Sequence, residues 1–168
     1  MSAAAAIKLY GVPLSQPFRA VAWSLLQHHV AFDVQLCVPG ATSKIGSLHE
    51  SFLAKSKTGT VPLLELDGVA IGESPVILSH LCETLGWNPL LHGPPGSARK
   101  VQIDSYLHWH HGGTRQLAKL SAEHLRPDLK VEIDRPQILQ HLARLNDAWL
   151  VDDYIAGTDL SIADFLAY

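Results

Sequence analysis

The segment "VPLSQPFRA" (12–20) places a serine, Ser15, between a short apolar run and a stretch with helical spacing. The unpaired N–H groups and the dipole of a helix N-terminus favour an anion at such a position. A hydroxyl there is suited to stabilise a thiolate, because an ordinary thiol has a pKa of roughly 8.5 and each unit of lowering corresponds to about 1.4 kcal/mol. The same position also suits a plain helix N-cap, which contributes about 1 kcal/mol. On Ser15 alone, both interpretations stay open.

Two further segments have residues suited to binding parts of a small peptide. In "TVP" (60–62), a cis bond before Pro62 would expose the backbone of Val61 to an extended peptide. At Glu73-Ser74, a second helix N-terminus offers N–H groups to a carboxylate, and Glu73 offers an acceptor to an ammonium group. Together with Ser15 these segments describe a small thiol peptide as ligand. The alternatives are a proline that only begins a strand and a serine that only caps a helix.

These residues require an alternating set of strands and helices around them. Apolar spacing predicts a strand at 7–11, a helix from Pro17, a strand at 31–38 and a short helix near 47–55. A hairpin over 63–71 and a helix from Ser74, as N-cap, to Gly86 follow. This order is typical of a thioredoxin-like domain. Redox members of that fold carry Cys-x-x-Cys at the site of Ser15, and the absence of a thiol pair here excludes dithiol exchange.

The second half of the chain has a different pattern. The segment "GWNPLLHGPPG" predicts a linker, and all later segments have helical spacing. We expect one long helix from Ser97 to Leu125, a second along 138–149, and a third that begins at Ser161 with Asp164 as its capping partner. The predicted fold class is therefore an α/β thioredoxin-like N-terminal domain over 1–86, a linker at 87–96, and an all-α C-terminal domain over 97–168.

Composition narrows the classes of function. The chain has 168 residues, is 47% hydrophobic and 17% charged, and carries a formal net charge of −3. It shows no basic footprint for nucleic acid, no apolar run long enough for a membrane span and no secretory signal at its start. Cys37 and Cys82 lie far apart, so we expect a reducing, cytoplasmic location.

Ten histidines raise the question of a metal site. His108 and His111 share a helix face with His110 nearby, but no acidic or cysteine partner at ligand spacing completes a set. We therefore expect no metal, and a polar helix face with one or two histidines lining a pocket. Gly112-Gly113 on the same helix predicts either a close approach by the other domain or a substrate, or a kink.

Four motifs together carry a family resemblance: "LYGVPLSQPFRA", "GTVPLLELDG", "ESPVILSHL" and "GTDLSIADFLAY". On these motifs the chain resembles the cytosolic glutathione S-transferases and is most similar to the theta class. The resemblance implies a cytoplasmic homodimer in detoxification. Its N-terminal domain would bind glutathione as co-substrate, without another cofactor, and its helical domain would hold a small hydrophobic electrophile.

The same resemblance implies roles for individual residues. Ser15 would stabilise the glutathione thiolate, Val61 beside Pro62 would pair with the cysteinyl backbone, and Arg115 would face the sulfur. The other implied contacts are to the two ends of the peptide: the γ-glutamyl group at Glu73 and Ser74, and the glycyl end at His49 and Thr60. Thr60 stands where a lysine is common in the family, which weakens the expected hold on the glycyl carboxylate.

The last predicted helix has fewer than two turns before the sequence ends, whereas further helices follow it in the resembled family. We therefore expect a C-terminally truncated chain with an incomplete helical domain. The main alternative to a transferase is a non-catalytic binding or assembly module, or an inactive fragment. A glutathione-dependent isomerase or dehalogenase is a further alternative.

Overall fold

The structure is a computed structural model that describes residues 7–125 and 131–167. The chain forms two compact units, one that ends at Trp87 and one that spans Asn88–Ala167. The first is a thioredoxin-like unit with a mixed four-stranded sheet, and the second is helical, which confirms the predicted fold class. The connection between the first and second predicted helical segments lies partly outside the described residues, and the chain's last residue lies wholly outside them.

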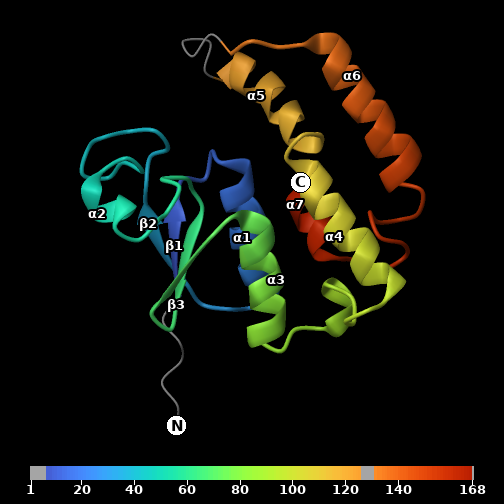
Figure 1. The fold of residues 1–168 in the computed structure, drawn as a ribbon, viewed down its shortest axis with the longest axis horizontal. Coiled ribbons are helices and arrows are strands. Elements are labelled where there is room, and N and C mark those ends of the chain that lie inside the picture. The colour runs from blue at the N-terminus through green and yellow to red at the C-terminus, as the bar shows by residue number, and fades with distance from the viewer. Residues whose placement is uncertain (1–6, 126–130, 168) are drawn as a thin grey trace. The chain divides into compact units, whose positions relative to one another are not determined.

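The sheet of the first unit has the strand order β2-β1-β3-β4. Strand β1 is parallel to β2 and antiparallel to β3, and β3 and β4 form the predicted hairpin. Helices α1 and α3 lie side by side along one face of the sheet, and α2 lies on its other side (Figure 1). The bounds are β1 Lys8–Gly11, α1 Gln16–Gln27, β2 Asp33–Leu36, α2 Glu50–Leu53, β3 Leu63–Leu66, β4 Val69–Gly72 and α3 Ser74–Thr84.

Alternation along the central strands produces a core on each face. Leu9 and Leu64 are paired across β1 and β3, and both are fully buried. Their neighbours point the other way, as the period of two in a strand requires. On that second face Leu63 packs with three buried residues and a partly buried ring: Cys37, Phe52, Val61 and Tyr10.

The junction between β1 and α1 requires a glycine. Gly11 has a φ of 153°, and a Cβ there would lie 2.5 Å from Cδ2 of Phe18. Phe18 is buried at 3% exposure in the first turns of α1, so its ring has little room to move away. The absence of a side chain at Gly11 therefore lets the chain turn sharply from the central strand into the helix.

The start of α3 differs from the prediction by one residue. The N-cap is Glu73 and not Ser74, which is the first helical residue with Pro75 behind it. The reason lies in the backbone, because Glu73 takes a left-handed φ of 62° that turns the chain from β4 into the helix. The helix cannot extend backward through a residue in that conformation.

The predicted single helix from Ser97 to Leu125 is wrong. The structure has α4 at Ala98–His110, a short 3₁₀ turn at Thr114–Leu117 and α5 at Ala118–Leu125. The interruption falls at Gly112-Gly113, where a Cβ on Gly113 would overlap the indole of Trp109. Of the two alternatives that the glycines left open, the structure shows the break, and the group that lies close to Gly113 is the Trp109 ring of α4 itself.

Two more helices complete the described part of the second unit. Helix α6 spans Arg135–Arg144, continues as a π turn over Leu145–Trp149, and is followed after a loop by α7 at Ile162–Ala167. The predicted pairing at the start of α7 is present, since the Ser161 N–H and hydroxyl donate to Asp164 Oδ2 over 2.8 and 2.7 Å. Asp164 Oδ1 also accepts from the N–H of Ile155 at 2.8 Å, so one carboxylate ties the loop to the helix that packs on α4.

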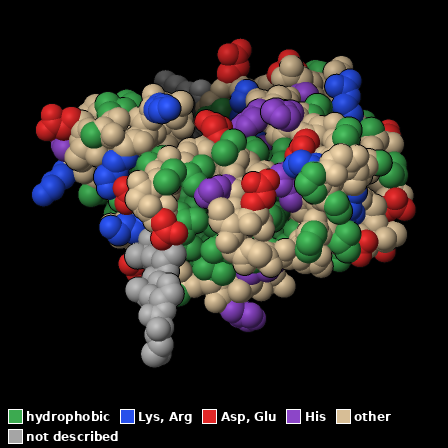
Figure 2. Space-filling model, turned by 60° about the horizontal axis from the view of Figure 1, so that its bottom comes forward, with side chains coloured by type: hydrophobic (Ala, Val, Ile, Leu, Met, Phe, Trp, Pro, Cys, Tyr) green, Lys and Arg blue, Asp and Glu red, His purple; other side chains and the backbone are tan. Residues whose placement is uncertain are grey.

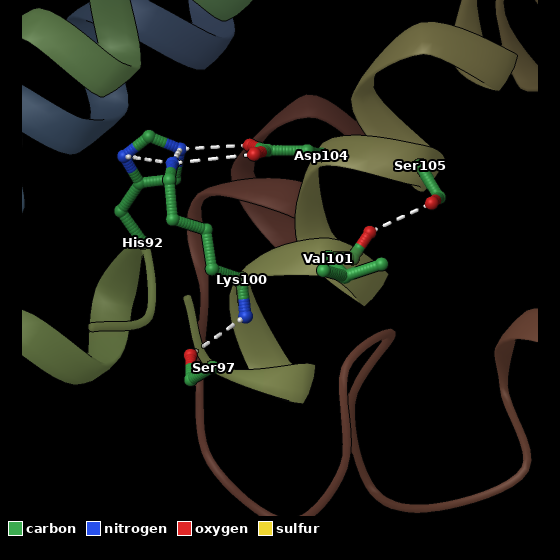
Figure 3. A network of polar contacts seen from close by, with 6 residues as sticks. All are labelled: His92, Ser97, Lys100, Val101, Asp104 and Ser105. Atoms are coloured by element: carbon green, nitrogen blue, oxygen red, sulfur yellow. Dashed lines mark hydrogen bonds and ion pairs between the residues drawn. The ribbon is translucent and has the colours of Figure 1, made fainter. Parts of the chain in front are cut away.

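A polar network joins the 3₁₀ turn at Pro89–Leu91 to the start of α4 (Figure 3). Buried His92 places Nε2 at 2.9 Å from Asp104 Oδ1, and Lys100 Nζ lies 2.7 Å from the same Nε2 and 3.2 Å from Asp104 Oδ2. Burial alone would raise the pKa of Asp104, but the hydrogen bonds from His92 and Lys100 outweigh it and the pKa lies below its ordinary value. The network holds the segment after Trp87 against its own unit.

The surface of the molecule mixes residue types. Charged side chains of both signs lie among apolar side chains and histidines on the face drawn in Figure 2. None of the helices over the described residues is both long enough and apolar enough to cross a bilayer.

Arg99 on α4 binds carbonyl groups from two distant loops. Its Nε donates to Leu90 O at 2.8 Å, and its two Nη atoms donate to the carbonyls of Ala156, Asp159 and Leu160 at 2.6, 2.8 and 3.2 Å. The planar guanidinium with five N–H donors suits such a set of acceptors, and a lysine ammonium would reach fewer of them.

We predict that Arg99→Met lowers the free energy of unfolding of the second unit by about 2 to 3 kcal/mol, because several carbonyls lose a charged donor. Arg99→Lys should have an intermediate effect. Urea unfolding followed by circular dichroism measures both. The control is Arg144→Met at the exposed end of α6, and an Arg99→Met effect no larger than that of the control would contradict the assignment.

Candidate functional site

The predicted binding segments of the first unit all start at one end of the sheet, where the strands finish or begin. Tyr10 pairs with Leu63, and Leu63 pairs with Gly72 on its other side. This row joins the end of β1, the start of β3 and the end of β4. The loop to Ser15, the segment before β3 and the turn into α3 therefore all begin at the same end of the sheet, although their side chains come from segments far apart in sequence.

Ser15 occupies the N-cap position of the twelve-residue helix α1, but its side chain does not cap the helix. Its backbone is held at both ends, since its N–H donates to Val12 O at 2.9 Å and its carbonyl accepts from Arg19 N at 3.0 Å. Among the described residues, the half-buried hydroxyl makes no hydrogen bond. The cap interpretation thus explains the position of Ser15 but leaves its hydroxyl available to a ligand.

Arg19 is a positioning residue that the sequence interpretation missed. Its Nη1 donates to the carbonyls of Pro13 and Leu14 at 3.2 and 3.0 Å. The guanidinium lies one turn after Ser15 on α1 and holds the loop that leads into the helix. The spacing of four residues from Ser15 is the signal that would have found it.

The Val61–Pro62 bond is cis, as expected for this position of a thioredoxin-like fold. The Val61 side chain is buried at 9% exposure in the core cluster with Leu63, and its backbone N–H and carbonyl have no hydrogen-bond partner among the described residues. Thr60 before it is exposed, and its hydroxyl lies 2.6 Å from that of Thr58. The segment thus presents backbone groups in the manner of a strand edge.

The two residues at the start of α3 differ in exposure. Glu73 is exposed, while Ser74 is buried at 3% exposure. His49 lies at the N-cap of α2, where its Nδ1 accepts from Ser51 N at 3.2 Å and lies 2.8 Å from Ser51 Oγ. One ring nitrogen of His49 is therefore committed to local structure, and α2 is only four residues long.

A second hydroxyl near this edge, that of Tyr10, is fully engaged. It donates to Glu65 Oε2 at 2.8 Å and accepts from Lys55 Nζ at 2.9 Å, while Lys55 pairs with Glu65 Oε1 at 2.8 Å. Burial is the main cause that raises the pKa of Tyr10. The hydrogen bonds from Lys55 and Tyr10 overcome the effect of burial on Glu65 and lower its pKa. Tyr10 is therefore no competitor to Ser15 as a hydroxyl donor.

Arg115, the remaining predicted residue, belongs to the second unit. It lies exposed in the 3₁₀ turn after α4 and has no partner among the described residues. The other predicted site residues belong to the first unit. It lines an open hollow of about 500 Å³ together with His111, Gln116, Ala118, Lys119 and Val131.

Behind Arg115 lies a buried hydrogen-bonded trio. Thr114 Oγ1 lies 2.7 Å from His110 Nδ1 and 2.9 Å from the hydroxyl of Tyr106. Burial, with smaller contributions from His111 and Arg115, lowers the pKa of His110 to about 4, and burial raises that of Tyr106 to about 12. Both side chains are thus neutral near pH 7 and hold the turn that carries Arg115. Over residues 7–125 and 131–167, no three His, Cys, Asp or Glu side chains converge as metal ligands would.

Comparisons with known proteins found both a family model and solved structures that are similar to this chain. Residues 9–89 match the family model described as "Glutathione S-transferase, N-terminal domain". No curated protein matches the chain.

Solved structures match nearly the whole chain. An epsilon-class glutathione S-transferase from the housefly, Musca domestica, is 28% identical over 95% of this chain and 73% of its own, with a TM-score of 0.79. A glutathione transferase homologue from Drosophila mojavensis, solved with bound glutathione, is 26% identical over 96% of this chain and 74% of its own, with a TM-score of 0.75. Human glutathione transferase theta-2 is 22% identical over 96% of this chain and 69% of its own. Its TM-score of 0.80 shows the shared fold.

These matches support a glutathione S-transferase N-terminal domain in the first unit and a glutathione transferase fold for the chain. They include epsilon-class, delta-class and theta-class proteins and do not single out the theta class.

We predict that Glu65→Gln lowers the free energy of unfolding at pH 7 by about 0.5 to 1 kcal/mol, a modest value because Lys55 is 40% exposed. Since the folded pKa of Glu65 lies below its ordinary value of 4.5, its stabilisation is complete above that value and is lost as the pH falls through the folded pKa. The difference between wild type and variant should therefore close as the pH falls below 4.5 and through the folded pKa.

Thermal unfolding at several pH values measures this difference. The control Glu132→Gln removes the same charge from an exposed loop position. A difference for Glu65→Gln that persists unchanged at low pH would contradict the role given to the carboxylate.

Proposed function

We propose that this protein is a glutathione transferase that conjugates the glutathione thiolate to small electrophiles. The observation that carries the proposal is the uncommitted Ser15 hydroxyl at the N-terminus of α1. It lies at the end of the sheet from which the segments of Val61–Pro62 and Glu73–Ser74 also extend. The match of residues 9–89 and the glutathione-bound structure of a relative support the choice of thiol peptide.

The first step of the proposed mechanism is ionisation of the bound thiol. The Ser15 hydroxyl donates a hydrogen bond to the sulfur, and the N-terminal dipole of α1 adds positive potential at the same place. The thiol proton passes to solvent. Both contributions favour the thiolate over the thiol and so lower the thiol pKa toward neutral pH.

The second step is direct attack of the thiolate on the electrophile. A carbon–sulfur bond forms, the bond to the leaving group breaks, and the leaving group departs with the bonding electron pair. The enzyme forms no covalent intermediate. Its contribution is to hold a charged nucleophile in position, which lowers the barrier by orientation and by electrostatic stabilisation.

The peptide backbone and its ends have proposed contacts on the same unit. Val61, oriented by Pro62, pairs with the cysteinyl backbone through its unpaired N–H and carbonyl groups. Glu73 holds the γ-glutamyl ammonium group and Ser74 the carboxylate. The glycyl end lies near Thr60 and His49, whose Nε2 is uncommitted among the described residues.

The proposed role of Arg115 is to add positive charge near the glutathione sulfur. The proposed role of the helical unit is to hold a small hydrophobic electrophile. We also propose a cytoplasmic homodimer of the theta class that acts in detoxification, on the strength of the four motifs that carry the family resemblance. A non-catalytic binding module is the second candidate, and the neutral Thr58–Thr60 pair at the glycyl end, where a lysine is common, favours it.

The test is retention on immobilised glutathione combined with conjugation of 1-chloro-2,4-dinitrobenzene. We expect wild type to be retained and active. Ser15→Ala should still be retained, but its kcat/KM should fall about tenfold to a hundredfold, since a hydrogen bond to a charged group contributes about 1.5 to 3 kcal/mol. The apparent thiol pKa in its pH–rate profile should rise toward that of an ordinary thiol.

The matched control is Ser43→Ala, which removes an exposed hydroxyl in a loop of the same unit. Retention of wild type without turnover would favour the binding module and reject the transferase. If Ser15→Ala leaves turnover unchanged, the role of Ser15 in stabilising the thiolate is rejected, but the transferase proposal is not.

A further inference from the structure

The polar network at the start of the second unit joins three ionisable side chains through one ring nitrogen (Figure 3). His92 Nε2 lies 2.9 Å from Asp104 Oδ1 and 2.7 Å from Lys100 Nζ. His92 is buried at 8% exposure, so protein groups and not solvent supply most of its contacts. The two partners lie about one helical turn apart on α4, and Lys100 Nζ is 3.2 Å from Asp104 Oδ2.

The two contacts make opposite demands on Nε2 of His92. A carboxylate only accepts hydrogen bonds, and an ammonium group only donates them. A ring nitrogen of histidine is a donor when it carries a proton and an acceptor when it does not. Nε2 therefore serves Asp104 in one state and Lys100 in the other. The network has two arrangements that differ in the position or number of protons on one buried ring.

The charge of the ring decides between these arrangements. A neutral ring with its proton on Nδ1 accepts from Lys100, which makes the shorter of the two contacts. A charged ring donates from Nε2 to Asp104 and repels the Lys100 ammonium, whose Nζ also lies 3.4 Å from Nδ1. Imidazole is the side-chain group that ordinarily changes its charge between pH 5 and 8.

Over that range the partners of His92 keep their charges. Burial is the first influence on the pKa of Asp104 and raises it, but the hydrogen bonds from His92 and Lys100 bring it below its ordinary value of 3.8. The segment Asn88–Gly93 contains no other ionisable side chain. A response of this network to pH near neutrality therefore comes from the His92 ring.

Other charged groups on the neighbouring elements are engaged elsewhere or exposed. Arg99 on α4 binds the carbonyl groups described above. Asp164 on α7, the helix that packs on α4, accepts from groups at its own N-terminus and in the preceding loop. Asp159 in that loop and His108 on α4 are exposed.

We propose that His92 is a pH-sensitive switch that exchanges Lys100 for Asp104 as its partner when the ring takes up a proton. The proton comes from solvent, and only an N–H bond forms. At higher pH the ring accepts from Lys100. At lower pH the charged ring pairs with Asp104, and the Lys100 ammonium turns toward solvent, to which its side chain is already 26% exposed. This inference is independent of the proposed transferase activity.

The backbone around His92 is held, so the exchange moves a side chain and not the chain itself. The 3₁₀ turn Pro89–Leu91 directly before it is bound by Arg99, whose Nε donates to Leu90 O at 2.8 Å. Directly after it, Gly93 lies so close to α4 that a Cβ would meet the backbone nitrogen of Lys100 at 2.6 Å. The long side chain of Lys100 is the part of the network that is free to move.

Nitrogen NMR of the full chain, labelled at histidine, tests the proposal directly, because it distinguishes the two neutral tautomers and the charged ring. Above about pH 8 we expect the wild-type His92 proton on Nδ1. Lys100→Met should move it to Nε2, since Asp104 then remains as the partner of that nitrogen. The control Lys44→Met, in an exposed loop, should leave the tautomer unchanged. A proton on Nε2 in the wild type above pH 8 would overturn the proposal without any variant.

The pH at which the His92 ring is half protonated is the second readout. Lys100→Met should move this midpoint to higher pH and Asp104→Asn to lower pH, each by about half a unit or more, because the variants remove a like and an opposite charge. Exposed His29 in the first unit is the internal reference, and its midpoint should not move. A His92 midpoint that Lys100→Met leaves unchanged would reject the coupling.

Urea unfolding separates a switch from a static ion pair. Lys100 is attracted to the network when His92 is neutral and repelled by the ring when it is charged. The loss in urea midpoint caused by Lys100→Met should therefore be about twofold larger near pH 8 than near pH 5. In a His92→Asn background the loss should be the same at both pH values. A loss that is independent of pH in the chain with His92 would show a static pair and overturn the switch.

Discussion

The close approach of the Phe18 ring to the backbone at Gly11 is the constraint on which the geometry of the first unit depends. Any Cβ at Gly11 would meet that buried ring at 2.5 Å, so the chain can turn there only without a side chain. The turn leads from the central strand, whose Leu9 is fully buried, directly into α1. Because the strand is paired on both sides, the turn fixes where α1 and Ser15 begin relative to the sheet.

Two hydroxyl groups at the same end of the sheet have different uses. That of Tyr10 holds the structure together, and that of Ser15 is left available to a ligand. Tyr10 is committed to Lys55 and Glu65, and its hydrogen bonds hold α2 and β3 together. Ser15 lies at the position of a helix cap but makes no capping bond. A cap contributes about 1 kcal/mol, so an N-cap serine that leaves its hydroxyl uncommitted forgoes a measurable part of the stability of a small domain. Such a local departure from the best stability is typical of a functional position.

In the second unit, a glycine next to an aromatic ring again determines what the helix can present. The contact of Gly113 with Trp109 interrupts the helix after α4, and the 3₁₀ turn that follows carries Thr114 into the buried trio and Arg115 onto the surface. Arg99 and Asp164 anchor the loops on the far side of α4 through carbonyl and N–H groups. The unit is therefore held by charged side chains bound to backbone groups.

Local patterns in the sequence were sufficient for most of the strands and helices, the hairpin and the cap at Ser161, because each depends on neighbours within a few residues. The cis bond at Pro62 was expected from its place in a thioredoxin-like order of elements. The segments that carry Ser15, Val61 and Glu73 were found in the same way. The start of α3 was placed one residue late, and the helix break at Gly112-Gly113 was not resolved, because a left-handed Glu73 and a packed Trp109 ring are decided by surroundings.

By itself, then, the amino-acid sequence determined which elements form and which residue types stand at their ends, since backbone propensity and apolar spacing act locally. Only the tertiary structure decided that the Ser15 hydroxyl has no hydrogen-bond partner among the described residues, that Tyr10 is engaged, and that Glu123 pairs with Arg135. Those outcomes depend on which side chains packing brings within hydrogen-bond distance, and that distance is a property of the folded chain.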